Sequence, residues 1–204
     1  MALPLIFHAA PGASAAGPSG SLRGLAAAVG HVRAGLPRVA PPAPMPLPTG
    51  RVVSGGRWTD EGIRTELAAI LGPGLAPALR SEFEWYMCRG AFFHTDAHFE
   101  GVLFGVWSLA GPPVEIVFPR AGVRVDGSPG YVVVFDPFEV HGVLRPGRAH
   151  YAADEYADAE ASVFIGFELT LTEAVAGAFR VAPTGSGRTL SSSTRVAAGS
   201  GALE

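Results

Sequence analysis

The sequence contains no lysine, no asparagine and no glutamine, and all 15 of its basic residues are arginine. A Schiff-base lysine and an N-linked glycan are therefore excluded, and any cation that pairs with a buried carboxylate must be an arginine. Cys88 is the single cysteine, so no disulfide can form within the chain. A reducing cytoplasm is the expected location of a protein with this cysteine content.

Charge and long apolar runs are also scarce. Charged residues make up 16% of the 204 residues and the net charge is −3. Proteins that bind nucleic acid or an anionic membrane usually carry a basic surface, which this charge does not indicate. No apolar run approaches the ~20 residues of a membrane span. The stretch 1–7 is apolar but has no basic residue and contains Pro4, so a secretory signal is not expected. With 48% hydrophobic residues, one domain with a sizeable core is expected.

Composition divides the chain into three predicted segments. Residues 1–50 form an N-terminal arm, with a short helix at 21–29 and a segment at 37–50 that holds six prolines and cannot be regular structure. Residues 51–182 hold helices and a β-rich core. Residues 183–204 are rich in serine, glycine and alanine and form a C-terminal tail.

Hydrophobic periodicity predicts a helix capped by Thr59 and ended near Gly72, a second short helix at about 75–81 and a final helix at 171–180. Between them, short apolar or alternating runs are separated mostly by glycine, proline or aspartate. The predicted strands are 82–86, 91–99, 102–109, 114–118, 122–125, 131–135, 140–144 and 162–171. This pattern favours a mostly β protein with flanking helices, built as a barrel or jelly roll.

A candidate metal site lies in the aromatic-rich run around His94. Side chains alternate across a strand, so His94, Asp96 and His98 would share one face. His141 follows Asp96 by 45 residues, and a jelly roll could bring it opposite them. Two imidazoles and one carboxylate are the ligand set of a mononuclear non-haem iron site with open positions for substrate and oxygen.

Alternatives to this ligand set remain open from the residues alone. His98 could be the third ligand, could support the ligands from outside, or could lie away from the pocket. A His-x-Asp pair also arises by chance, and the three residues could be a hydrogen-bonded structural cluster.

The order of several residues resembles the iron(II)/2-oxoglutarate-dependent oxygenases over about residues 82–170. The matching positions are Tyr86, Gly90, Phe93, His94, Asp96, Gly130, Asp136, Pro137, His141 and Gly142. The resemblance implies a double-stranded β-helix core and His94, Asp96 and His141 as ligands of iron(II). It also implies two cosubstrates, 2-oxoglutarate and molecular oxygen. The commonest reaction of the family is hydroxylation, which implies hydroxylation of a small molecule here.

In that family the far carboxylate of 2-oxoglutarate meets a basic residue on a late strand, often helped by a hydroxyl. The predicted strand 162–171 has no basic residue, which departs from the pattern. Arg148 is the preferred candidate for this contact, Arg145 is the second, and Tyr86 could add its hydroxyl. A solvated turn is the competing interpretation for both arginines.

Two other functions are compatible with the sequence. The first is a cupin-like metalloprotein. Gly130, Pro137 and His141 also resemble the second cupin motif, and His94, His98 and Glu100 could replace the first. Such a protein could be an isomerase, a dioxygenase that needs no 2-oxoglutarate, or a binding module. The second is a non-catalytic β-barrel protein whose proline-rich arm at 37–50 docks a partner. Neither nucleic acid nor a membrane is an expected partner, and the oligomeric state cannot be predicted.

Overall fold

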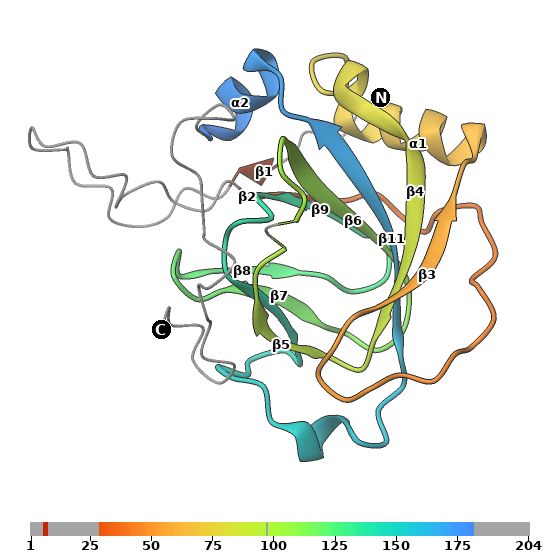
Figure 1. Cartoon of the computed structure of the whole chain (residues 1–204), viewed down its shortest axis with the longest axis vertical. Coiled ribbons are helices and arrows are strands. Elements are labelled where there is room, and N and C mark those ends of the chain that lie inside the picture. The colour runs from red at the N-terminus through yellow and green to blue at the C-terminus, as the bar shows by residue number, and fades with distance from the viewer. Residues whose placement is uncertain (1–5, 8–28, 97, 182–204) are drawn as a thin grey trace, which may run out of the picture.

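Two antiparallel sheets face one another in the computed structural model, which describes residues 6–7, 29–96 and 98–181 (Figure 1). The larger sheet has the order β1-β2-β9-β6-β11-β4-β3 and the smaller one the order β5-β10-β7-β8. The strands of the larger sheet are β1 (Ile6–Phe7), β2 (Val29–Arg33), β3 (Val53–Trp58), β4 (Leu79–Cys88), β6 (Val102–Ala110), β9 (Tyr131–Phe135) and β11 (Ser162–Thr170). Those of the smaller sheet are β5 (Ala91–His94), β7 (Glu115–Phe118), β8 (Val123–Asp126) and β10 (His141–Leu144).

The path of the chain identifies the fold. From β4 to β11 it passes back and forth between the two sheets, and only β7 and β8 follow one another within a single sheet. The central strands of the larger sheet consequently pair in the order β9-β6-β11-β4. This is a double-stranded β-helix, which confirms the predicted mostly β fold with flanking helices.

Strand β6 is the central strand of the larger sheet, and apolar side chains cover both of its faces. Trp107 on one face packs in a cluster with Leu67 of helix α1 (Glu61–Leu71), and helix α2 (Glu173–Phe179) joins the same cluster. Phe104 on the other face packs in the space between the sheets, with Ile116 of β7. Fully burying one side chain such as Leu67 contributes about 1.5–3 kcal/mol. The cluster between the sheets, which contains Phe104 and Ile116, surrounds the candidate site.

Helix α1 begins and ends at residues that satisfy its free backbone groups. Asp60 is the N-cap, and its carboxylate accepts a hydrogen bond from the Ile63 amide at 2.9 Å. Gly72 ends the helix with a φ of 76°, a conformation that glycine adopts without a Cβ clash. The prediction that Thr59 is the cap was wrong by one residue, because the aspartate carboxylate holds the capping position.

Several elements differ from the prediction. The segment predicted as a second helix at 75–81 is a single helical turn, η1 (Ala76–Ala78), after which β4 begins. Strands β1, β2 and β3 were not predicted at all. Residues 21–28 of the predicted first helix and the predicted tail at 183–204 lie outside the described residues. A further helical turn, η2 (Ala153–Tyr156), lies in the connection from β10 to β11.

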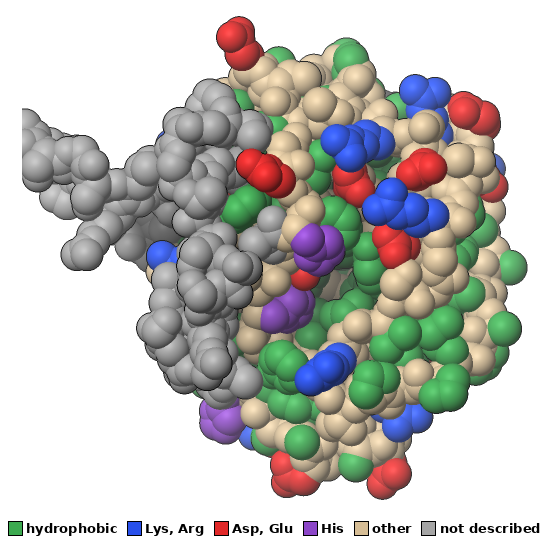
Figure 2. All heavy atoms as spheres, in the orientation of Figure 1, with side chains coloured by type: hydrophobic (Ala, Val, Ile, Leu, Met, Phe, Trp, Pro, Cys, Tyr) green, Lys and Arg blue, Asp and Glu red, His purple; other side chains and the backbone are tan. Residues whose placement is uncertain are grey.

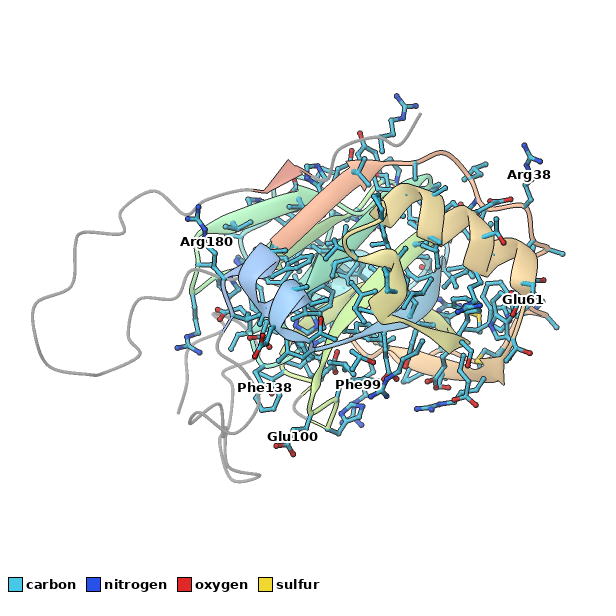
Figure 3. The ribbon with its side chains drawn as sticks, turned by 90° about the horizontal axis from the view of Figure 1, so that it is seen from above. Arg38, Glu61, Phe99, Glu100, Phe138 and Arg180 are labelled. Carbon is cyan, nitrogen blue, oxygen red and sulfur yellow. The ribbon has the colours of Figure 1, made fainter. Side chains whose placement is uncertain are left out.

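Figure 3 shows helices α1 and α2 on the outer side of the larger sheet. Phe99, Glu100 and Phe138 lie together along another edge of the molecule, where the loops that follow β5 and β9 meet. Within the described part of the chain, neither α-helix has the length and apolar character that crossing a bilayer requires.

Candidate metal centre

The pairing of two strands brings His94 and His141 together. β5 and β10 are antiparallel neighbours in the smaller sheet, and His94 is the residue directly across from His141. Their ring centroids lie 4.5 Å apart. Gly142 follows His141 at a point where a Cβ would lie 2.9 Å from Cδ1 of Phe93 and 3.0 Å from the carbonyl oxygen of Ala91. The close approach of the two strands therefore depends on a glycine beside the second histidine.

Asp96 lies in the loop just after β5 rather than in the strand. Its backbone amide donates to the carbonyl of Pro137 at 2.8 Å, and its own carbonyl accepts from the amide of Phe99 at 2.9 Å. Pro137 belongs to the turn that precedes β10, where Asp136 accepts from the amide of Phe138 at 3.0 Å. The loop that carries Asp96 is thus tied directly to the turn that leads into His141.

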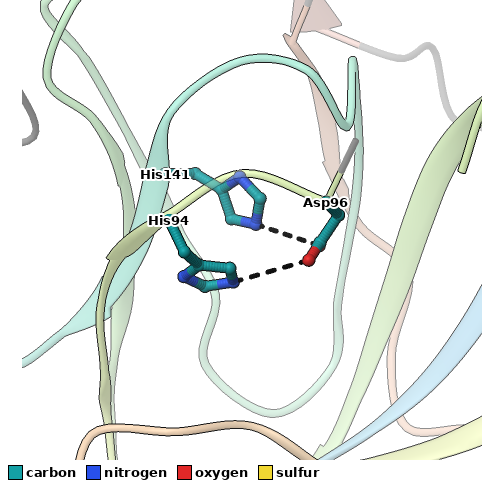
Figure 4. A group of neighbouring side chains, drawn as sticks. All are labelled: His94, Asp96 and His141. Atoms are coloured by element: carbon teal, nitrogen blue, oxygen red, sulfur yellow. Dashed lines mark ion pairs between the residues drawn. The ribbon is translucent and has the colours of Figure 1, made fainter. Parts of the chain in front are cut away.

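Figure 4 shows His94, Asp96 and His141 pointing toward a common point. Nε2 of His94 is 3.8 Å from Oδ1 of Asp96, and Nε2 of His141 is 3.4 Å from Oδ2. One ligand atom from each residue lies within 4.8 Å of those of the other two. The structure therefore brings together the three residues that the sequence pattern singled out.

Backbone carbonyls orient both imidazole rings. Nδ1 of His94 is 2.8 Å from the carbonyl oxygen of Phe92, and Nδ1 of His141 is 2.9 Å from that of Glu139. A carbonyl oxygen can only accept a hydrogen bond, so each Nδ1 must carry the proton. Nε2 of each ring is therefore the nitrogen that faces Asp96. It can donate to the carboxylate when it carries a proton, and it can bind a metal ion when it does not.

Burial and charge favour the ligand forms of two of the three residues. Burial and the neighbouring His141 lower the pKa of His94 from its ordinary value, against the opposing effect of Asp96, which keeps the ring neutral. Burial works to raise the pKa of Asp96, but the hydrogen bond and charge of His141 with the charges of His94 and His98 hold it below its usual range. A divalent cation would take the place of a proton on Nε2, and it would satisfy the two ring nitrogens and the carboxylate together.

The group lies on the wall of a cavity of about 370 Å³ between the two sheets, a size typical of small-molecule sites. Figure 2 looks onto this hollow, with histidine side chains at its border, hydrophobic side chains inside it, and arginine and acidic side chains beside it. The apolar part of the lining consists of Val52, Phe99, Phe104, Val106, Ile116, Phe135, Val143 and Phe164. Such a lining suits an apolar ligand next to the group of three.

Tyr86 and Glu84 of β4 form the polar wall of the same cavity. The Tyr86 hydroxyl donates to Oε2 of Glu84 at 2.8 Å. Burial, together with this hydrogen bond and the charge of Glu84, raises the pKa of Tyr86 well above its usual value, so the hydroxyl keeps its proton. Gly166 of β11 makes room for the ring, because a Cβ at that position would overlap it. Tyr86 therefore has a fixed place in the lining of the cavity. The sequence alone did not decide whether it lines the site.

The structure places the other candidates differently. His98 lines the cavity with its ring 4.1 Å from that of Phe99, and it is not part of the group of three. Arg145 and Arg148 do not line this cavity; they border a separate hollow together with Pro112 and Pro113.

Both arginines already have partners in the β10–β11 connection. Arg148 pairs with Glu155 at 2.9 Å, and the guanidinium of Arg145 lies 5.3 Å from the centre of the Tyr156 ring. Neither arginine therefore lies where the predicted contact with 2-oxoglutarate would require it, because the chain leaves the cavity directly after β10. Among the described residues, the cation that lines the cavity is Arg57 of β3.

Sequence reasoning missed Glu84, Ser54 and Arg57 in the lining of the cavity. A signal for Glu84 was present, because the predicted alternation over residues 82–86 places Glu84 on the same strand face as Tyr86. No local signal marked Ser54 and Arg57, which reach the site only because β3 pairs with β4 at the edge of the larger sheet.

Comparison with known proteins gives similarities of structure only. No family model matches the sequence, and no curated protein matches it. A prolyl-4-hydroxylase from Pseudomonas putida is similar over 55% of this chain and 61% of its own, with 21% identity and a TM-score of 0.33. A cupin domain from Bordetella pertussis Tohama I is similar over 44% of this chain and 81% of its own, with 14% identity and a TM-score of 0.29. A polyketide cyclase from Streptomyces resistomycificus has 16% identity and a TM-score of 0.28 over 46% of this chain and 63% of its own.

Proposed function

We propose that this protein is an iron(II)-dependent oxygenase in which His94, Asp96 and His141 hold the metal. The observation that carries the proposal is the convergence of three ligand atoms within 4.8 Å on the wall of an apolar cavity. Two imidazoles and a carboxylate bind one face of Fe(II) and leave the opposite positions open for oxygen and substrate. The bound metal would supply the activation of oxygen.

The chain's own contribution to such a reaction is orientation and exclusion of water. The carbonyls of Phe92 and Glu139 hold the two imidazoles in the tautomer that exposes Nε2. Asp96 supplies one negative charge and is held by the Pro137 carbonyl. The apolar lining favours a small, partly apolar substrate and keeps water away from its reacting carbon.

The cosubstrate distinguishes two versions of this proposal. 2-Oxoglutarate has a second carboxylate, and burying it without a cation would be strongly unfavourable. The lining cation among the described residues, Arg57, has a side chain that is 56% exposed and lies beside Glu82, Glu84 and Glu168. These contacts favour the cupin-like version, a dioxygenase that takes its electrons from the substrate and needs no 2-oxoglutarate.

Anaerobic reconstitution with iron(II) tests the metal site. The wild-type protein should bind one iron per chain, and Asp96→Ala and His141→Ala should bind none while retaining their circular dichroism spectra. Failure of the wild-type protein to retain iron(II) would refute the proposal.

Titration of the iron-loaded protein with 2-oxoglutarate separates the two versions. We expect no change in the visible absorption of the iron under anaerobic conditions, and no release of succinate once oxygen is admitted. Release of succinate would establish the 2-oxoglutarate-dependent version instead, and Arg57 would then be the first residue to replace.

A further inference from the structure

The polar wall of the cavity is built by two paired strands. β3 and β4 are antiparallel neighbours, with Ser54 across from Tyr86 and Arg57 across from Glu84. All four side chains line the cavity that holds the metal group. Glu84 is the residue that the other three contact.

Both hydroxyl protons on this wall are donated to Glu84. The Tyr86 hydroxyl donates to Oε2 at 2.8 Å, and the Ser54 hydroxyl donates to Oε1. Ser54 also accepts a hydrogen bond from the amide of Gly56 at 3.2 Å. A hydroxyl that donates its one proton can offer a further partner only its lone pairs. A ligand in the cavity therefore meets hydrogen-bond acceptors at Glu84 and Tyr86.

Arg57 lies at the exposed rim of this wall and is shared among carboxylates. Its Nη1 is 3.1 Å from Glu82, its Nε is 3.5 Å from Glu84 and its Nη2 is 4.0 Å from Glu168. The side chain of Arg57 is 56% exposed, whereas that of Glu84 is 19% exposed. The charged group that lies deeper in the cavity is therefore the carboxylate.

We propose that Glu84, with Tyr86 beside it, makes the cavity selective for a substrate that carries an ammonium group on an apolar body. The apolar body would pack against Phe99, Phe104 and Phe164, and the ammonium would donate to Glu84. A buried or half-buried carboxylate attracts a charged donor more strongly than a neutral one, and it repels an anion. This inference rests on the proposed function, because it takes the cavity beside His94, Asp96 and His141 as the substrate site.

Calorimetric binding of two matched probes tests the proposal on the iron(II)-loaded protein under anaerobic conditions. The probes are 2-phenylethylamine, which is protonated at neutral pH, and 2-phenylethanol, its neutral counterpart. We expect the amine to bind the wild-type protein about 10-fold or more tighter than the alcohol, as expected for a hydrogen bond to a charged group.

Two variants of β4 separate the role of Glu84 from a general effect of charge. Glu84→Gln should weaken binding of the amine about 10-fold or more and leave the alcohol within about 3-fold. Glu82→Gln removes the same charge from the same strand, at a residue that also pairs with Arg57 but does not line the cavity. It should leave the affinities of both probes unchanged, and thermal melting of each variant checks that it is folded.

The same titrations on metal-free protein keep this proposal distinct from the metal assignment. Because the ammonium contacts Glu84 and not the metal, its preference over the alcohol should persist without iron. Loss of iron binding alone would refute the proposed function and leave the amine result standing. The present proposal is overturned if the wild-type protein shows no binding of the amine, binds it no tighter than the alcohol, or loses nothing on Glu84→Gln.

Discussion

Replacement of Asp96 by asparagine should abolish the stabilisation of this protein by iron(II). The change keeps the size of the side chain and removes the one anionic ligand of the candidate site. In the metal-free protein the asparagine side chain can still form a hydrogen bond with Nε2 of His141, from which the Asp96 carboxylate lies 3.4 Å, because it has both a donor and an acceptor. The metal-free variant should therefore melt close to the metal-free wild-type protein.

The expected size of the effect follows from linkage between binding and folding. A ligand that binds only the folded state at about 100 times its Kd stabilises the protein by about 2.7 kcal/mol. For a chain of this length each kcal/mol raises the Tm by about 2–4 °C. Iron(II) should therefore raise the Tm of the wild-type protein by about 5–11 °C and that of Asp96→Asn by nothing measurable.

Differential scanning fluorimetry under anaerobic conditions, with and without iron(II), measures this difference. Asp158→Asn is the matched control, because it removes the same charge from an exposed position and should keep the full rise in Tm. An equal rise in Asp96→Asn and in the wild-type protein would show that the carboxylate is not a ligand, and the assignment of all three residues would then have to be abandoned.

Three further predictions concern the surroundings of the site. His98→Ala should weaken iron(II) binding about 10- to 100-fold without abolishing it, as for a group that supports a site from outside; loss as complete as in His141→Ala, measured by metal content after dialysis, would make His98 a ligand. Gly142→Ala should lower stability by about 1–3 kcal/mol, since the added methyl group meets Phe93 in a packed interior; chemical denaturation of the metal-free protein measures this, and an unchanged midpoint would contradict it. Burial raises the pKa of the Cys88 thiol to about 12; because the unfolded thiol ionises first, this contribution to stability is complete below about pH 8.5 and is lost as the pH rises toward 12. A thiol reagent should accordingly modify Cys88 at pH 8 only after denaturant is added, and rapid modification of the folded protein would refute its burial.

Local sequence patterns were sufficient for most of the secondary structure. The alternation in the run that became β4 and the apolar stripe of α1 predicted a strand and a helix close to where they lie, because side-chain period follows backbone geometry. β3 was not predicted because its Ser54-Gly55-Gly56 stretch lacks the apolar residues of a typical strand. Pairing with β4 holds it at the edge of the larger sheet.

The candidate ligands could be named from their chemical types, but their convergence is a property of the tertiary structure. His94 and His141 face one another only through the register of β5 against β10, and Asp96 reaches them from a loop that Pro137 holds. The placement of the arginines was equally beyond local patterns. Arg148 follows His141 closely in the sequence, yet it pairs with Glu155 outside the cavity, while Arg57 reaches the rim from a distant strand.

The sequence by itself determined the periods of the strands, the helix α1 and the residue types available for binding a metal. The tertiary structure alone decided which of these residues meet, that Glu84 receives the protons of Ser54 and Tyr86, and which charges line the cavity. The physical reason is that periodicity acts between neighbours along the chain, whereas strand register and sheet order depend on the packing of residues that are distant in the sequence.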